Sequence, residues 1–544
     1  MGKYAHFESV EDTNLLQLYG RHAEVARDIH QDTLRKFTGN ESLVVELVQE
    51  NPLSADKAML DEMSKYDVMS VSTGIGMGAL LHGTGLSDKN NVDLYRQHFE
   101  QEDMPIYVVA AGNEGESRRA TPRVADFSRT SMVVGEANVK DGAPYIEEHS
   151  SVNNPTLVTD NPFNRGEKYQ YYDTTPSLTG HENLIQSWLV DKEFSMRFDT
   201  FKSGEGKNAD ENALADKYWE IRSQMADDGY GESQEVQDKI KTFMANPQQL
   251  HSLVMAEIRE NKDVDENGYA SDIDGTSFSA PEQAGYISGA MYEQEQREEK
   301  NLPILMKEEI STLIKMATLD VSAREGQNER LHTFNNAANF QFTGAGMHGV
   351  FNPEMFRKLL DESYKRIENN PDIDRDAITA VMSAEITGQR GDIPVIVSFD
   401  ESVASNIVIE RTRLDLDYSV NGTIPHHVSI QKEGQETGYS KLQTSSNNLD
   451  FTAWSRSEIE FGETVKHDDT WEIKVLNGHD TKLSNVSITV YGYNEGSLMD
   501  QMMDYSKEIS PLYLPQLDAP APTQTEEVEV RMNSKAAEAS TLSL

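Results

Sequence analysis

The chain has 544 residues, 37% of them hydrophobic, which is enough apolar sequence for two or three globular domains and too much length for one core. Its formal net charge is −43, from 92 acidic and 49 basic residues, so we expect no nucleic-acid or anionic-membrane partner. There are no cysteines, which excludes disulfides and thiolate metal sites. No apolar run approaches a membrane span and Met1 is followed by no apolar signal core, so we expect a soluble protein and leave its compartment open.

The N-terminal part of the chain alternates between helical and extended patterns. The predicted elements are helices over 13–36, 54–64 and 91–100 and strands over 44–48, 67–74 and 106–111. The helix over 13–36 is amphipathic, because its leucine, valine and isoleucine residues recur at helical spacing. This β-α-β-α rhythm predicts an α/β fold with a doubly wound parallel sheet.

A short motif over 274–281, Asp-Gly-Thr-Ser-Phe-Ser-Ala-Pro, carries the strongest chemical signal in the chain. The Gly-Thr-Ser turn runs into small residues and a proline, so the hydroxyl of Ser277 is expected at the N-terminus of a helix. Free backbone N–H groups and the helix dipole at that position favour developing negative charge. A serine before a helix is more commonly an N-capping residue, and that is the alternative interpretation of Ser277.

Two earlier segments carry matching chemistry. The run Val-Val-Ala-Ala-Gly-Asn-Glu-Gly places the side-chain amide of Asn113 at the carboxyl end of a predicted parallel strand. Such an amide can donate to an oxyanion, and one donor of this kind lowers a reaction barrier by about 3–4 kcal/mol. The alternative for Asn113 is a turn asparagine close to a glycine. The other segment is the buried strand that ends in Ser72, Thr73 and Gly74.

Together these three segments resemble the subtilisin-like serine proteases, or subtilases, in the order in which that family has them. The resemblance implies that Ser277 is the nucleophile, that Asn113 donates to the oxyanion, and that Ser72, Thr73 and Gly74 lie at the active-site end of the strand that pairs with the substrate backbone. It also implies a serine endopeptidase that acts on a protein or peptide substrate through an acyl-enzyme.

A subtilase also needs a histidine base and an aspartate that orients it, and only 66 residues precede the substrate strand. The segment Gly-Arg-His-Ala-Glu-Val-Ala resembles the family's histidine helix, although an ungapped alignment puts Arg21 at the catalytic position and His22 one residue later. Asp12 resembles the aspartate and lies ten residues before His22. His22 and Asp12 are therefore the candidates, with a helix-surface histidine and a helix-capping aspartate as the alternatives.

The composition changes along the chain and predicts a domain order. We expect a subtilase-like domain over 1–369 with a helical insertion at about 160–262 near the substrate cleft, a polar linker over 370–392, a β-domain over 393–496 and a tail over 497–544 that is largely disordered after about 512. Short alternating strands in the β-domain predict a β-sandwich or jelly roll. The segments around Trp471 resemble the P domain of kexin- and furin-like convertases, with Val486 where that family usually has a second tryptophan.

Acidic residues are the one candidate metal-binding feature. Four of them cluster before the candidate nucleophile, namely Asp263, Asp265, Asp272 and Asp274, and subtilase loops often hold Ca²⁺. Their spacing matches no defined calcium loop, so solvated surface acids are the simpler interpretation and Ca²⁺ stays an option. No other cofactor is implied.

Three hypotheses about function follow from these patterns. The first is an active serine endopeptidase with Ser277 as its nucleophile. The second is a catalytically inactive scaffold or binding protein that keeps the fold and lacks the usual N-terminal aspartate and histidine. The third is an enzyme whose active site is completed by a partner chain.

Overall fold

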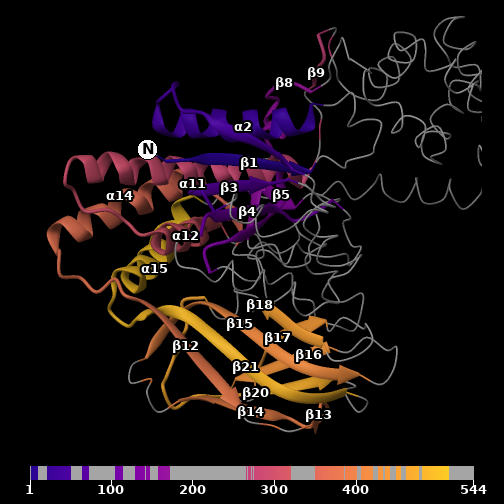
Figure 1. Cartoon of the computed structure of the whole chain (residues 1–544). Helices are drawn as coiled ribbons and strands as arrows, with labels where there is room; N and C mark the ends of the chain where they lie inside the picture. Colours follow the sequence, from indigo (N-terminus) through magenta and orange to yellow (C-terminus); the bar gives the residue numbers. More distant parts are fainter. Residues whose placement is uncertain are drawn as a thin grey trace, which may run out of the picture.

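A computed structural model describes residues 2–9, 21–50, 64–72, 104–113, 129–140, 143–146, 157–171, 265, 267–270, 273, 275–319, 349–384, 386, 388–400, 403, 406–420, 427–432, 435–441, 449–454, 461–476 and 481–513. Two large sheets dominate these residues, with a group of helices beside and between them (Figure 1). Among the described residues, none of the helices combines the length and the apolar character that a membrane crossing needs.

The first sheet has nine strands in the order β10-β11-β7-β5-β4-β3-β1-β2, with β6 paired to β5. Its strands are β1 (Tyr4–Ser9), β2 (Val45–Glu50), β3 (Val68–Val71), β4 (Ile106–Ala110), β5 (Met132–Lys140), β6 (Ala143–Ile146), β7 (Leu157–Asp160), β10 (Thr318–Leu319) and β11 (Val350–Phe351). Every neighbouring pair from β2 through to β11 is parallel. The predicted parallel α/β sheet is therefore confirmed, with antiparallel β10 and β6 added.

Helix α11 (Thr276–Glu299) is the central helix of this part of the chain, and α2 (His22–Thr38) runs beside it (Figure 1). Its first ten residues are all buried, because it packs against α2 on one side and against β3, β4, β5 and β7 on the other. The two helices approach so closely that a Cβ atom on Gly285 would lie 2.4 Å from Cβ of Thr33. A Cβ atom on Gly289 would lie 2.2 Å from the ring of Phe37, so both positions require glycine.

The other helices of the described residues pack against one another, and α12 (Lys307–Met316) also contacts α11. They are α12, α14 (Pro353–Asn369) and α15 (Leu498–Ile509), with short 3₁₀ turns η3 (Pro162–Arg165) and η7 (Ser510–Leu512) and a small ribbon of β8 (Tyr169–Gln170) and β9 (Tyr269–Ala270). Asn352 caps α14 by accepting from the N–H of Met355, and Ser497 caps α15 by accepting from the N–H of Asp500.

A buried polar network joins α2 to the sheet and to α11. The hydroxyl of Ser70 on β3 lies 2.9 Å from Nδ1 of His6 on β1 and 3.2 Å from Nδ1 of His30 on α2. The other nitrogen of His30, Nε2, lies 2.8 Å from the hydroxyl of Ser288 on α11. Both imidazoles are fully buried, and burial, followed by the neighbouring His6, lowers the pKa of His30 to about 3. His30 is therefore neutral in the folded protein at every ordinary pH.

This network predicts acid-sensitive stability. Between pH 6.5 and about 3 the unfolded chain binds a proton at His30 and the folded chain does not, so the free energy of unfolding falls as the pH is lowered through that window, by up to about 1.4 kcal/mol per pH unit. The variant His30→Gln keeps a hydrogen-bonding side chain that does not titrate. Urea denaturation from pH 4.5 to 7.5 should give a shallower pH slope for His30→Gln than for wild type. Equal slopes would contradict the assignment.

The second sheet has ten strands, follows the order β17-β16-β20-β14-β12-β21-β15-β18, and is antiparallel throughout, with β13 and β19 at its sides. Its strands are β12 (Ala377–Ala384), β13 (Gln389–Arg390), β14 (Val395–Phe399), β15 (Ile407–Val420), β16 (His427–Lys432), β17 (Gln435–Lys441), β18 (Leu449–Trp454), β19 (Thr464–Val465), β20 (Thr470–Leu476) and β21 (Thr481–Asn494). The expected β-domain is thus an antiparallel sheet, with Trp471 fully buried in its core. The jelly-roll arrangement stays a prediction.

Two predicted boundaries need correction, and a third is untested. Residues 370–392 were expected to be a linker, yet they contain β12, which pairs with β21 over eight residues and buries Ala380 and Met382. The tail predicted over 497–544 begins with α15, whose Met499 and Met502 are fully buried in the core shared with the first sheet. The first helix begins at residue 22 in the described part of the chain, and its expected start near 13 lies outside the described residues.

The apolar patterns of β12 and α15 explain why the sequence analysis missed these two elements. β12 alternates exposed and buried positions, a two-residue period that charged flanking residues obscured. α15 places its methionines on one helical face, which the polar sequence after it concealed. The helices predicted over 54–64 and 91–100, most of the insertion over 160–262 and the tail beyond 513 lie outside the described residues.

A buried ionic cluster joins the two sheets. The carboxylate of Glu410 on β15 accepts from Nζ of Lys315 on α12 at 2.6 Å and from Nε of Arg129, just before β5, at 2.7 Å. Lys315 and Glu410 are completely buried. Burial acts to raise the pKa of Glu410, but Arg129 and Lys315 outweigh it and hold that pKa at about 2. Arg411 adds a hydrogen bond to the carbonyl of Ser131 at 3.1 Å.

This cluster predicts that the second sheet stabilises the first domain. The variant Glu410→Ala would leave the buried charge of Lys315 without its partner, a loss that typically costs about 3–5 kcal/mol. We expect a drop of that size in the free energy of unfolding measured by urea denaturation. The matched control Glu508→Ala removes an exposed glutamate of α15 and should change stability by less than about 0.5 kcal/mol. Equal effects from the two variants would contradict the prediction.

Candidate active site

Ser277 lies in the first turn of α11, as its motif predicted, and is 9% exposed. Its Oγ donates to the backbone carbonyl of Ser72 at 3.1 Å, and Oγ of Ser72 donates to the carbonyl of Ser277 at 2.7 Å. These reciprocal bonds join the N-terminus of α11 to the carboxyl end of β3. The structure therefore brings together Ser277 and Ser72, which are 205 residues apart in sequence.

Asn113 follows β4 and reaches the same helix terminus. Its Oδ1 accepts from the backbone N–H of Thr276 and from the Thr276 hydroxyl, both at 2.9 Å. The Thr276 oxygen also accepts from the N–H of Gly112 at 3.1 Å. Because Oδ1 of Asn113 accepts from Thr276, the Nδ2 group of Asn113 faces Gly275. A Cβ atom added to Gly275 would lie 3.2 Å from this Nδ2. The side-chain amide that the sequence singled out thus lies next to the residue before Ser277.

Gly275 itself needs to be glycine. It has φ +145° and ψ +137°, a conformation that L side chains rarely adopt. Its N–H donates to the buried carboxylate of Glu136 on β5 at 2.8 Å. The Gly-Thr-Ser turn is therefore held by Asn113, which follows β4, and by Glu136 on β5. Glu136 is a residue that the sequence analysis missed.

His22 is the first residue of α2 and lies beside the nucleophile segment. Its ring centroid is 5.1 Å from that of Phe278, the residue after Ser277, and 6.4 Å from that of Tyr171. The preceding residue, Arg21, donates from its guanidinium to Gln170 at 3.0 Å and from its backbone N–H to the carbonyl of Tyr171 at 2.6 Å. Of the two residues at the predicted histidine motif, His22 is thus the one that packs against α11.

The carboxyl end of β1 belongs to the same edge of the sheet. Phe7 on β1 pairs with Val71, the last residue of β3, so the next residues along the two chain segments are Glu8 and Ser72. In open α/β sheets ligands bind beyond the carboxyl ends of the strands. The sequence analysis did not predict β1, and the position of Glu8 at this edge went unnoticed. Asp12, Thr73 and Gly74, also proposed from sequence, lie outside the described residues.

Comparisons with known proteins add limited information. No protein-family model and no curated protein sequence matches the chain. Among solved structures, the patellamide maturation protease PatA is 12% identical with a TM-score of 0.29, covering 66% of this chain and 97% of that one. Fervidolysin from Fervidobacterium pennivorans, a keratinolytic enzyme related to subtilisin, is 9% identical with a TM-score of 0.28, covering 84% of this chain and 66% of that one. At these identities and TM-scores the likenesses assign no activity to this chain.

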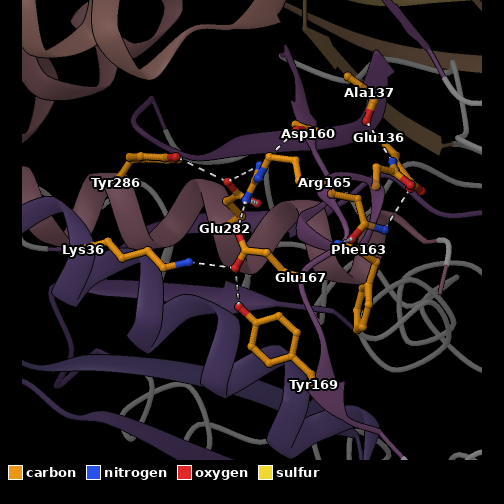
Figure 2. Close-up of polar contacts among 12 residues, drawn as sticks. Lys36, Glu136, Ala137, Asp160, Phe163, Arg165, Glu167, Tyr169, Glu282 and Tyr286 are labelled. Atoms are coloured by element: carbon orange, nitrogen blue, oxygen red, sulfur yellow. Dashed lines mark hydrogen bonds and ion pairs between the residues drawn. The ribbon is translucent and has the colours of Figure 1, made fainter. Parts of the chain in front are cut away.

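A polar cluster fastens α11 just beyond the candidate nucleophile. Figure 2 shows the guanidinium of Arg165 between Asp160 and Glu282, and the carboxylate of Glu167 between Lys36 and the Tyr169 hydroxyl. Glu282 is 2% exposed, and burial, opposed by Arg165, raises its pKa to about 7. The cluster links α11 to η3 and, through Lys36, to α2. It therefore holds the helix that carries His22 beside the helix that carries Ser277.

None of the described residues adds support for a Ca²⁺ site. Oδ1 of Asp265 accepts from the backbone N–H groups of Asn267 at 2.8 Å and Tyr269 at 3.0 Å, so this carboxylate closes a local turn. Asp263, Asp272 and Asp274 lie outside the described residues. Within the described ranges, no three acidic, histidine or cysteine side chains are grouped as a metal ion would need.

The hydroxyl of Thr276 is predicted to be a structural requirement of the site. Thr276→Val keeps the shape of this buried side chain but leaves the Gly112 N–H without an acceptor, which typically costs about 1–3 kcal/mol. The control Thr276→Ser retains the hydroxyl. Urea denaturation should show Thr276→Val to be clearly less stable than Thr276→Ser. The prediction is wrong if the valine variant is as stable as the serine variant.

Proposed function

We propose that the chain is a serine-type endopeptidase that uses Ser277 as its nucleophile. The observation that carries the proposal is the contact between Asn113 and Thr276, which places a side-chain amide beside a serine in the first turn of a buried helix. In an acyl transfer, Ser277 Oγ attacks the peptide carbonyl carbon, and the carbonyl oxygen takes the negative charge. The helix dipole and the Nδ2 group of Asn113 stabilise that charge.

The proton of Ser277 needs an acceptor, and His22 is the proposed base. Its ring packs on Phe278, one residue from the nucleophile. The hydroxyl donates to the Ser72 carbonyl in this structure, so the serine side chain must rotate to reach the imidazole. His22 would then take the proton, pass it to the leaving amine, and accept another from the water that hydrolyses the acyl-enzyme.

A carboxylate is needed to orient the base, and two candidates exist. Asp12 comes from the sequence resemblance, and Glu8 is supported by its position near the end of β1, level with Ser72, the residue after β3. Both lie N-terminal to His22, as the subtilase order requires. Mutating each residue separately decides between them, because the reaction rate should fall strongly only when the orienting carboxylate is removed.

The substrate is proposed to be a peptide that pairs with the segment after β3. Ser72 lies at this sheet edge, and Thr73 and Gly74 come next in the sequence. A peptide backbone can add at such an edge as a further strand. We propose further that the insertion over about 160–262 narrows access to this edge and that the second sheet is a P-like domain. No metal or organic cofactor enters the proposed reaction, and Ca²⁺ would act only on stability.

A non-catalytic scaffold is the second candidate function. Arg21 occupies the position that the resemblance assigns to the catalytic histidine and is bonded to Gln170 instead. The Ser277 hydroxyl is also bonded to a backbone carbonyl. On this hypothesis the sheet edge binds a peptide without cleaving it.

Covalent labelling with a fluorophosphonate probe tests the proposal. Wild type should be labelled, and Ser277→Ala should not be. Ser279→Ala is the matched control, since it removes the other buried serine of the same helical turn and should keep its labelling. Asn113→Ala should lower the labelling rate about 10²–10³-fold and His22→Ala by about 10⁴-fold.

The other outcomes separate the hypotheses. Labelling lost in Ser277→Ala but kept in His22→Ala points to a base supplied by another part of the protein or by a partner chain. An unlabelled wild type refutes the single-chain enzyme, and binding of an unmodified peptide would then favour the scaffold. Labelling that survives in Ser277→Ala refutes Ser277 as the nucleophile.

A further inference from the structure

Glu136 is a buried carboxylate of β5 with no role in the chemistry described so far. It is fully buried, and its Oε2 accepts from the backbone N–H of Gly275 at 2.8 Å. Its Oε1 accepts from the side-chain amides of Asn161 at 2.9 Å and Asn164 at 3.2 Å. Figure 2 shows Glu136 and its polar contacts to the right of the Arg165 cluster. Three N–H donors therefore converge on one carboxylate.

Asn161 connects Glu136 to Ile273, on the N-terminal side of the turn at Gly275. Its Nδ2, which donates to Glu136, also donates to the carbonyl of Ile273 at 2.9 Å. Its Oδ1 accepts from the N–H of Phe163 at 3.1 Å, which fixes the orientation of the amide. The pair of Glu136 and Asn161 thus holds the C=O of Ile273 and the N–H of Gly275, which are four and two residues before Ser277, respectively.

The turn needs an external support of this kind. Gly275 has a positive φ and no side chain, so its own conformational preference is weak. Its N–H is buried at a helix N-terminus, where it has no intrahelical partner, and leaving it unsatisfied would cost about 1–3 kcal/mol. A carboxylate is a better acceptor than an amide at this point, because its hydrogen bonds are charge-assisted and its charge is favourable beside a helix N-terminus.

We propose that Glu136 is a positioning residue for Ser277: through Gly275 and Asn161 it sets the turn that presents the nucleophile beside Asn113. This inference rests on the proposed function, since positioning matters for reaction only if Ser277 reacts. It assigns Glu136 to no chemical step and to no contact with substrate.

The test compares Glu136→Gln and Glu136→Ala with wild type in the full-length chain. Glutamine is nearly isosteric but replaces one acceptor oxygen with an NH₂ group, which faces N–H donors. Hydrogen exchange of the peptide that contains Gly275 should be at least tenfold faster in both variants. The maximal fluorophosphonate labelling rate should fall about 10–100-fold, while the probe concentration at half-saturation stays the same.

Thr159→Val is the matched control. Thr159 is a buried residue of β7 that donates to Gln283, farther along α11, at 2.6 Å, so the variant removes a different bond between the sheet and the same helix. It should leave the exchange of the Gly275 peptide and the labelling rate unchanged. An equal loss in Thr159→Val would overturn the proposal, because it would indicate general destabilisation.

The experiment distinguishes failure of the positioning role of Glu136 from failure of the proposed protease function. Unchanged exchange at Gly275 in both Glu136 variants overturns the positioning role, whether or not the wild type is labelled. Faster exchange with an unchanged maximal labelling rate also overturns it. An unlabelled wild type refutes the proposed function, and with it any catalytic meaning of Glu136, even if the exchange result shows that Glu136 holds the turn.

Discussion

The structure depends on how the buried N-terminus of α11 is satisfied. A helix leaves its first four N–H groups without intrahelical partners, and water cannot supply acceptors freely where the first turn is packed against a sheet. Here Glu136 accepts from Gly275 and Asn113 accepts from Thr276. Glu136 belongs to the parallel strand β5 and Asn113 follows the parallel strand β4, so the sheet determines where the helix begins. The candidate nucleophile is the next residue along.

Strand β5 connects the turn at Gly275 to the second sheet. β5 carries Glu136, and the residues just before it, Arg129 and Ser131, bond to Glu410 and Arg411 of β15. The segment over 129–136 therefore contacts the ionic cluster at its start and the Gly275 turn at its end. On the other side of α11, the His6 and His30 network joins β1, β3 and α2. Polar contacts thus position α11 from both sides, while apolar packing supplies most of the burial.

Much of the fold could be predicted from the sequence, because strands buried on both faces give continuous apolar runs. β3 and β4 are of this kind, and the Gly-Thr-Ser motif placed Ser277 at a helix N-terminus. β1 was missed because His6 interrupts its apolar pattern. That histidine is accommodated with the help of Ser70, a partner 64 residues away. β1 lies beside β3 and is a strand that the sequence analysis did not predict.

The site was harder to predict than the fold. Ser277, Asn113 and Ser72 were found because each belongs to a local motif, and the structure brings these three together. Glu136 belongs to no motif. Its partner is the backbone N–H of Gly275, 139 residues away, and a backbone group leaves no trace in the sequence. Contacts of a side chain with a distant backbone can be recognised only once the chain is folded.

The central claim is that Ser277, Asn113 and His22 form one reactive site. The most direct measurement is a crystal structure of the full-length chain after reaction with a small fluorophosphonate. The account predicts phosphorus bonded to Ser277 Oγ, a phosphonyl oxygen about 3 Å from Nδ2 of Asn113, and the imidazole of His22 within hydrogen-bonding distance of Ser277 Oγ. A phosphonylated Ser277 whose oxygen points away from Asn113, or whose nearest imidazole is not that of His22, would contradict it.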